Sequence, residues 1–107
     1  MSGYRTTPKA DDDLVAGARW ILADNPEAAR RFLHGTFETF DRLAKFPESG
    51  PLARLKHRRL AGVRFSVMSP PFNRWLVFYR LSGNEVEILR VIYATQNWRG
   101  SPTSFFT

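Results

Sequence analysis

Apolar residues recur at steps of three and four along two neighbouring segments, which is the spacing of an amphipathic helix. The first segment follows the acidic run 11–13, where Asp can cap a helix and favour its dipole, and it stops near Asp24. The second starts at Asn25 and Pro26, a cap followed by a proline suited to the first helical position, and ends near Pro47. Because so few residues join them, the two helices are predicted to form an antiparallel hairpin.

Further along the chain the apolar period changes to two, which is typical of strands. Residues 63–67 alternate between apolar and polar, residues 74–81 are apolar at nearly every position, and residues 85–93 are rich in β-branched side chains. The middle segment is therefore predicted to be covered on much of both faces. Short turns join the three segments and favour an antiparallel meander. A further short strand is predicted at residues 4–7.

These elements predict an α+β fold in the order βααβββ, with the helical hairpin packed on an antiparallel sheet, because neither layer can bury its apolar face alone. A chain of 107 residues is one domain of common size, so residues 1–107 are assigned to a single domain. From about residue 94 the chain is rich in Gly, Ser, Thr and Pro. We expect a loosely ordered tail there, which Trp98, Phe105 and Phe106 could anchor.

Composition narrows the class of protein. The chain has no cysteine, which excludes disulfides and thiolate metal sites. It has no apolar run of about 18 residues and no apolar signal sequence at its start, so we expect a cytoplasmic protein without membrane association. His34 and His57 are the only histidines and match no metal-ligand spacing, and no cofactor-binding motif is present. The sequence therefore predicts no metal and no cofactor.

The net charge of +6 is unevenly distributed. Residues 1–48 carry seven Lys/Arg and eight Asp/Glu, whereas residues 49–84 carry seven Lys/Arg and no acid. Such a block indicates an anionic partner, such as nucleic acid, an acidic protein or a membrane surface, with a merely solvated face as the alternative. Acid–base cleavage of RNA is conceivable with candidates from this block and its surroundings. Those candidates are His57, Arg58, Arg64, Arg74, Tyr79 and Arg90.

Several short motifs occur in an order that resembles the RelE/ParE superfamily of toxins from bacterial toxin–antitoxin pairs. Together they cover roughly residues 4–93. The resemblance implies a βααβββ fold and neutralisation by a partner antitoxin. The motifs are the strand-to-helix entry 7–14, the second-helix start Asn25-Pro26-Glu27, the helix exit 43–50, and the strand segments 60–64, 75–80 and 86–91.

The branch of the superfamily decides the expected function. RelE-like members are ribosome-dependent ribonucleases that use a set of basic side chains on the sheet. This set is mostly missing here. The first meander strand carries Arg64 and Ser66, and the next strand has Leu76 where an arginine is expected. The arginine–tyrosine pattern near the C-terminus is not kept in residues 93–99 either. The Asn25-Pro26 junction looks more like the ParE branch, which implies a toxin that inhibits DNA gyrase and is not itself an enzyme. The alternatives to a gyrase inhibitor are a RelE-like mRNA endonuclease and a protein that keeps the fold but has lost toxicity.

The resemblance also suggests where partners bind. We expect an acidic, ParD-like antitoxin that folds along exposed apolar surface of the hairpin or along a sheet edge, with Trp20 as a candidate contact. We expect DNA gyrase as the target. Direct contact with nucleic acid is left open, although a protein target is favoured. The candidate target contacts are Arg58, Arg59, Arg64, Arg74, Arg90, Trp98 and Arg99.

Overall fold

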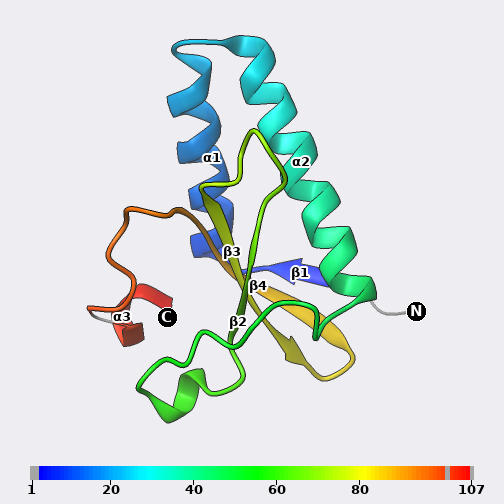
Figure 1. Cartoon of the computed structure of the whole chain (residues 1–107), viewed down its shortest axis with the longest axis vertical. Coiled ribbons are helices and arrows are strands. Elements are labelled where there is room, and N and C mark those ends of the chain that lie inside the picture. The colour runs from blue at the N-terminus through cyan, green and yellow to red at the C-terminus, as the bar shows by residue number, and fades with distance from the viewer. Residues whose placement is uncertain (1–2, 101, 107) are drawn as a thin grey trace.

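The computed structural model describes residues 3–100 and 102–106, so positions 101 and 107 of the expected tail lie outside the described residues. Two long helices stand side by side and extend beyond a small sheet (Figure 1). The elements are β1 (Tyr4–Thr6), α1 (Pro8–Leu22), α2 (Pro26–Lys45), the 3-10 helix η1 (Arg58–Leu60), β2 (Arg64–Val67), β3 (Trp75–Ser82), β4 (Glu85–Tyr93) and α3 (Pro102–Phe106).

The sheet has four strands in the order β1-β4-β3-β2. The strands β2, β3 and β4 pair antiparallel, as predicted for the meander. β1 lies at the edge beside β4 and pairs with it in parallel, with Tyr4 opposite Val86. The sheet is therefore mixed rather than wholly antiparallel, because the hairpin returns the chain so that the last strand runs in the direction of the first. The predicted fold class, a helical hairpin on a sheet in an α+β fold, is confirmed.

The start of α1 differs from the prediction. The helix begins at Pro8, not at the acidic run 11–13, and its N-cap is Thr7, whose hydroxyl accepts a hydrogen bond from the Ala10 amide at 3.1 Å. Pro at the first helical position and Thr before it form a complete start signal. The acidic run therefore lies inside the helix. The start of α2 is as predicted: Asn25 is the N-cap and accepts a hydrogen bond from the Ala28 amide at 3.1 Å.

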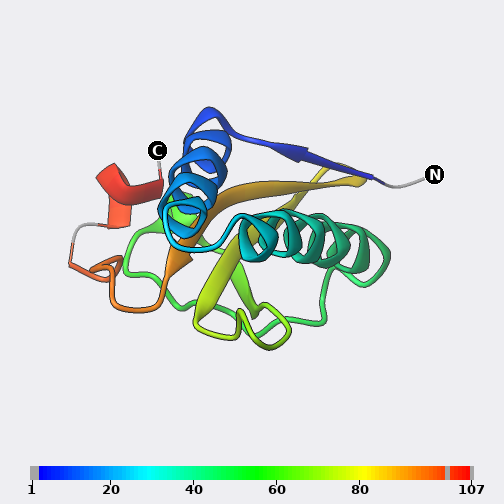
Figure 2. The ribbon, with the colours of Figure 1, turned by 90° about the horizontal axis from the view of Figure 1, so that it is seen from above.

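The sheet is buried on both faces. One face packs against the hairpin, where Phe32, Phe40 and Leu43 of α2 meet Val77 and Tyr79 of β3. The opposite face carries a second apolar cluster under the loops and the C-terminal segment, built from Ala53, Leu60, Val63, Phe78, Leu89, Ile92, Trp98 and Phe106. Strand β3 contributes to both clusters, which confirms that it is covered on both faces. Seen from above, the C-terminal segment lies beside the layers at the end away from the N-terminus (Figure 2).

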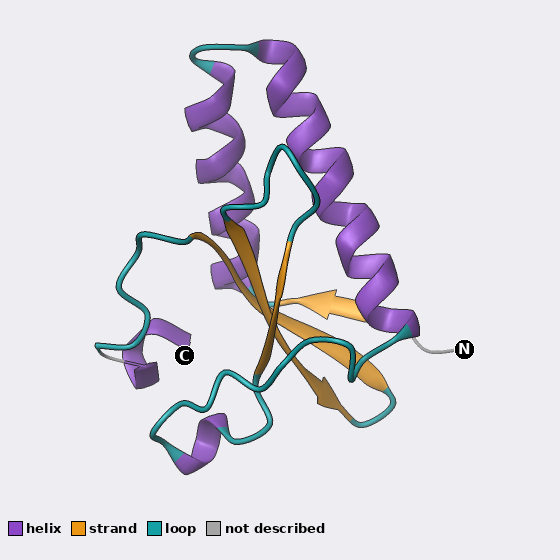
Figure 3. Ribbon diagram, in the orientation of Figure 1, coloured by secondary structure: helices purple, strands orange, loops and turns teal. Residues whose placement is uncertain are grey.

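The C-terminal segment is tied to the sheet by aromatic side chains. Trp98 and Phe106 are buried, and their rings lie 4.8 and 4.9 Å from the ring of Phe78. Lys9 of α1 donates a hydrogen bond to the carbonyl of Ser104. Figure 3 shows α3 returning beside the long loop that contains η1. The apolar residues offered as anchors of the tail thus complete the core on the second face of the sheet.

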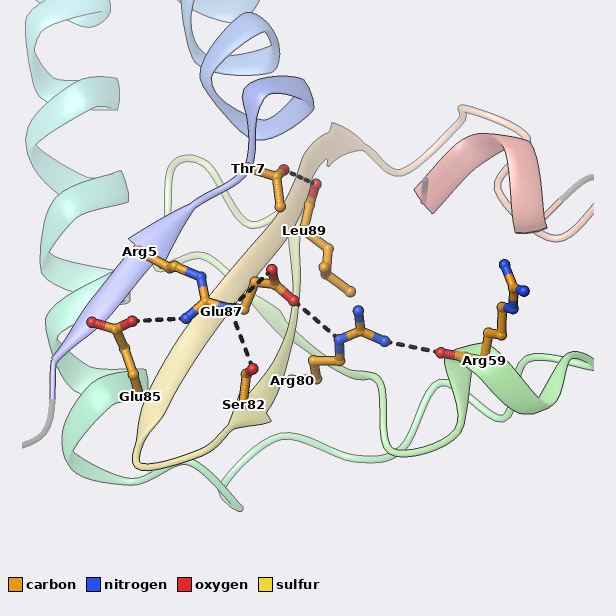
Figure 4. Close-up of polar contacts among 8 residues, drawn as sticks. All are labelled: Arg5, Thr7, Arg59, Arg80, Ser82, Glu85, Glu87 and Leu89. Carbon is orange, nitrogen blue, oxygen red and sulfur yellow. Dashed lines mark hydrogen bonds and ion pairs between the residues drawn. The ribbon is translucent and has the colours of Figure 1, made fainter.

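A chain of polar contacts braces the strands from β1 to η1 (Figure 4). Arg5 donates hydrogen bonds to Glu85 at 2.9 Å and to Glu87 at 3.3 Å, and the bond to Glu85 is the main reason that the pKa of Arg5 is raised. Glu87 also accepts a hydrogen bond from Arg80 at 3.1 Å, and Arg80 in turn donates to the carbonyl of Arg59 at 2.9 Å. Both carboxylates of β4 are therefore engaged inside the fold, and η1 is fixed to the sheet.

Candidate functional site

A long apolar hollow runs along the hairpin and has a volume of about 660 Å³. Both helices line it, and we call it the hairpin groove. Large apolar side chains stay exposed along it: Val15 and Leu22 are 51% exposed and Phe37 is 45% exposed. The lining residues are Asp11, Leu14, Val15, Ala18, Arg19, Leu22, Pro26, Ala29, Arg30, Leu33 and Phe37.

The helical sequence explains the shape of the groove. Leu14, Ala18 and Leu22 follow at steps of four on α1, and Ala29, Leu33 and Phe37 do the same on α2, so each set forms one row on its helix. Ala18 and Ala29 are small and leave room between rows whose other members are large. From residue 11 to residue 22 the lined part of α1 is about 17 Å long, at 1.5 Å per residue. A partner helix of about three turns matches that length.

Charged residues also line the hairpin groove. Asp11, Arg19 and Arg30 line the groove, and Arg30 forms an ion pair with Glu27 one turn earlier. Arg19 is exposed, and among the described residues it forms no ion pair. The groove thus combines apolar anchors with a cation at its edge, which is the pattern that an acidic amphipathic helix would match.

Trp20, the predicted antitoxin contact, lies outside the residues that line the hairpin groove. It is 67% exposed and its ring makes an edge-to-face contact with Tyr93 at 6.1 Å. A smaller hollow of about 260 Å³ lies here, with Gly17 and Trp75 also in its lining. A Cβ atom on Gly17 would lie 2.9 Å from the ring of Trp75, so the close approach of α1 to β3 requires glycine at this position.

The predicted target contacts do not form one cluster. The exposed Arg58 and Arg59 lie on η1, and the exposed Arg99 lines a hollow with Arg54 and Lys56, whereas the exposed Arg74 belongs to the turn between β2 and β3. Trp98 is only 8% exposed and packs under the guanidinium of Arg99, which lies 4.2 Å from its ring centroid. Trp98 therefore positions Arg99, and its own ring surface is largely covered.

Two of the predicted contacts are engaged inside the fold. Arg64 donates a hydrogen bond of 2.7 Å to the carbonyl of Gly50 and thereby holds the loop after α2. Arg90 forms a bidentate ion pair with Asp13 of α1, at 2.7 and 2.8 Å, and it also donates to the carbonyl of Phe105 at 2.6 Å. Both partners of this ion pair are 13% exposed. The assignment of these two arginines to target contact stays a prediction, and their partners give each a structural role.

Asp13 is a residue whose role the sequence did not indicate. A bulge on β4 shifts the register between Phe78 and Tyr79, and next to it the Val91 amide donates to Asp13 at 2.9 Å. On the other side of the bulge, the Thr7 hydroxyl donates to the Leu89 carbonyl at 2.9 Å. The start of α1 thus satisfies backbone polar groups of β4 beyond Ile88, the last residue of β4 that pairs with β1. No local pattern marks this role, because the partners of Asp13 lie 77 and 78 positions away.

Among the candidates for acid–base chemistry, Arg64 and Tyr79 meet at Gly50, whereas Arg90 is held at the start of α1 and His57 at η1. The Tyr79 side chain is buried, and its hydroxyl oxygen accepts a hydrogen bond from the Gly50 amide at 2.9 Å. His57 accepts a hydrogen bond from the Arg59 amide through Nδ1 and caps η1. Arg64 and Arg90 hold carbonyl and carboxylate groups of the fold. The described residues therefore do not bring this set around one reaction centre.

The described residues contain neither a metal-binding cluster nor a helix that could span a membrane. Within residues 3–100 and 102–106, no three His, Cys, Asp or Glu side chains gather in a way that could hold a metal ion. No helix in the described part of the chain combines the length and the apolar character that a bilayer span requires. The hairpin groove and the exposed cations thus remain the principal surface features.

Known proteins share the fold and the family of this chain. A chain of the chromosomal ParDE toxin–antitoxin system from P. aeruginosa has a similar fold, with a TM-score of 0.71, 23% sequence identity, and coverage of 87% of this chain and 96% of that chain. The model of the family described as ParE toxin of type II toxin–antitoxin system, parDE, matches residues 4–98, and the chain belongs to this family. It is also 34% identical over 79 residues to the toxin candidate Y4kP of Sinorhizobium fredii, over 74% of either chain.

Family membership confirms the ParE-type toxin that the motif order predicted, and it favours this branch over the RelE branch. The match extends from the start of β1 to Trp98, so it includes both helices that form the hairpin groove.

Proposed function

We propose that this ParE-family toxin inhibits DNA gyrase and is neutralised by a cognate acidic antitoxin, one amphipathic helix of which occupies the hairpin groove. The observation that carries the antitoxin site is the exposure of Val15, Leu22 and Phe37 along one continuous groove. Exposed apolar area of this extent is costly for a protein that acts alone, and a partner helix would bury it.

The proposed antitoxin helix would present apolar side chains at i, i+3 or i+4, and i+7, because the groove accommodates about three helical turns. Its acidic side chains would lie toward Arg19 at the groove's edge, where charge complementarity speeds encounter. A free antitoxin tail that is disordered would fold on binding and would lose chain entropy at that step. Such a complex can be tight and still be reversed when the antitoxin is degraded.

Matched pairs of substitutions test the groove. Val15→Asp with Leu22→Asp places two carboxylates in the groove, at positions that are each 51% exposed in the folded chain. Val67→Asp with Leu81→Asp makes the same change at positions that are 45% and 53% exposed and do not line the groove. Each toxin variant is expressed in bacteria together with the product of the adjoining reading frame. We expect growth to be rescued for the control pair and not for the groove pair; equal rescue of both would refute the groove assignment.

The proposed target is supported by membership of the ParE family. A toxin of this kind acts by recognising a surface, so its effect is expected to follow the amount of complex rather than a chemical turnover. Purified toxin is therefore added to gyrase, relaxed plasmid and ATP, and supercoiling is followed on agarose gels. We expect inhibition. The endonuclease alternative would be established by a different result. The plasmid would be fully supercoiled, and translating ribosomes would show site-specific mRNA cuts that disappear when Arg64→Ala replaces the unchanged toxin.

A further inference from the structure

Five exposed cations lie where the loop between α2 and β2 meets the segment after β4. They come from the loop after α2, from η1 and from the segment after β4, and we call them the basic face: Arg54, Lys56, Arg58, Arg59 and Arg99. The two chain segments meet around a hollow of about 500 Å³ that is lined by Arg54, Lys56 and Arg99. The face is thus assembled by the fold from two segments that lie 40 or more positions apart.

No carboxylate neutralises this face. Residues 49–84 contain no Asp or Glu, and among the described residues none of the five cations forms an ion pair. The two carboxylates of β4, Glu85 and Glu87, are held by Arg5 and Arg80 (Figure 4). Because the five charges have no internal partners, their fields add and attract an anionic ligand.

The fold holds the cations in place through their backbone. Arg80 donates to the carbonyl of Arg59 at 2.9 Å, and Figure 4 shows the Arg59 side chain pointing away from Arg80. Ala53 pairs with Val63 through a hydrogen bond of 2.8 Å, next to Arg54, which has a φ of 55°. A non-glycine residue persists in this left-handed conformation only where its surroundings impose it. Arg99 lies over the ring of the buried Trp98.

The chemistry of the face matches a phosphate backbone better than it matches a protein. Protein interfaces rely on buried aromatic and apolar anchors. The segments 54–59 and 99–100 contribute none of the exposed large apolar side chains of the described residues. Since Trp98 is covered, base stacking on it is not available either. The remaining interaction is charge on phosphate, which is independent of base sequence and strongly dependent on salt.

We propose that the basic face binds the phosphate backbone of duplex DNA directly, with no sequence preference. The face is formed by residues outside the hairpin groove, so a toxin with an occupied groove retains it. This inference goes beyond inhibition of gyrase and does not require it. If both hold, the toxin contacts the enzyme and the DNA that the enzyme has bound.

Salt dependence gives the proposal a quantitative form. Five phosphate contacts predict a slope of about −4.5 for log K against log salt, at about −0.9 per contact, so affinity falls about 500-fold between 50 and 200 mM salt. Removing two of the five contacts predicts a slope of about −2.7 and a fall of about 40-fold over the same range.

The experiment measures fluorescence anisotropy of a labelled 20-base-pair duplex titrated with the full chain. Two variants remove different parts of the face, Lys56→Gln/Arg99→Gln and Arg58→Gln/Arg59→Gln. The matched control, Arg31→Gln/Lys45→Gln, removes two exposed cations of α2, so it has the same net charge as each test variant. All four proteins are checked for native circular dichroism. Because the two test variants change different segments, a folding defect in one leaves the other as a test.

We expect both test variants to lower the slope to about −2.7 and the control to keep the slope of the unchanged chain. Two duplexes of different sequence should bind equally. Absence of binding at 50 mM salt, or equal weakening by control and test variants, would overturn the proposal. Tighter binding of polyglutamate than of DNA at equal ionic strength would also overturn it and would assign the face to an acidic protein. The assay contains no gyrase, so its failure is separable from failure of the gyrase proposal.

Discussion

Asp13→Ala is expected to destabilise the whole domain, although residue 13 stands in an acidic run near a helix start. The carboxylate accepts three hydrogen bonds, from Arg90 Nε at 2.7 Å, from Arg90 Nη2 at 2.8 Å and from the Val91 amide at 2.9 Å. Its removal leaves the guanidinium, which is 13% exposed, without its counter-ion and leaves a strand amide without its acceptor. The change therefore disconnects α1 from β4 at the bulge.

The expected cost is about 3–5 kcal/mol, which is the range for removing one partner of a buried ion pair. Each kcal/mol lowers the Tm of a domain of this size by about 4–8 °C, so a fall of at least about 12 °C is expected. Urea denaturation followed by far-UV circular dichroism gives the free energy of unfolding. Asp12→Ala is the control, because Asp12 is exposed in the same turn and its loss is expected to cost less than about 1 kcal/mol.

A double-mutant cycle separates the ion pair from other effects of these substitutions. Arg90→Met alone leaves Asp13 with only the Val91 amide, and the double variant removes both charges. A coupling energy of at least about 1 kcal/mol is expected, since the two side chains are in direct contact. If Asp13→Ala matches Asp12→Ala within about 0.5 kcal/mol, or if the coupling vanishes, the structural role assigned to Asp13 is wrong.

Three further predictions concern other parts of the chain. Gly50→Ala should lower the free energy of unfolding by about 2–3 kcal/mol in urea denaturation, because the new Cβ would lie 2.2 Å from the Phe65 carbonyl oxygen. The control Gly35→Ala, whose Cβ would lie 3.7 Å from Met68, should stabilise α2 by about 0.5–1 kcal/mol. Similar values for both variants would contradict the packing around Gly50. Burial, with a smaller contribution from Asp41, raises the pKa of Tyr4, so the unfolded chain loses this proton first and stability falls as the pH rises above about 10. Tyr4→Phe should make that fall shallower, and unchanged pH profiles of unfolding would refute this. Trp20 lies outside the hairpin groove, so Trp20→Ala tests whether the antitoxin also contacts α1 beyond it. The change should cost less than about 1 kcal/mol of stability, because Trp20 is 67% exposed, and should weaken the antitoxin complex in a binding titration; unchanged affinity would confine the antitoxin contact to the groove.

Local patterns were sufficient to predict most of the elements. The stripe from Ala29 to Ala44 predicted α2, and its cap at Asn25 is the observed one. The unbroken apolar run of β3 predicted burial on both faces, which the two core clusters confirm. The start of α1 was misplaced because three consecutive aspartates are a stronger cap signal by composition than a single Thr followed by Pro. In the structure the hydroxyl of Thr7 makes the capping bond.

What the sequence could not supply depends on contacts between distant residues. The parallel pairing of β1 with β4 joins residues about 82 positions apart, and no local pattern encodes it. The groove was expected only as exposed apolar surface of the hairpin or sheet edge, because the depth left by Ala18 and Ala29 depends on how the helices cross. Charge counting located the basic stretch. Only the structure separates Arg64 and Arg80, which brace the fold, from the exposed cations beside them.

The central claim is that this ParE-family toxin acts on DNA gyrase, and the most direct measurement is accumulation of gyrase–DNA cleavage complexes. Purified toxin is incubated with gyrase and supercoiled plasmid, the reaction is stopped with detergent and protease, and linear DNA is quantified on a gel. We expect linear DNA that increases with toxin and is suppressed when the cognate antitoxin is added first. No linear DNA at any toxin concentration, with supercoiling unimpaired in the same preparation, would contradict it.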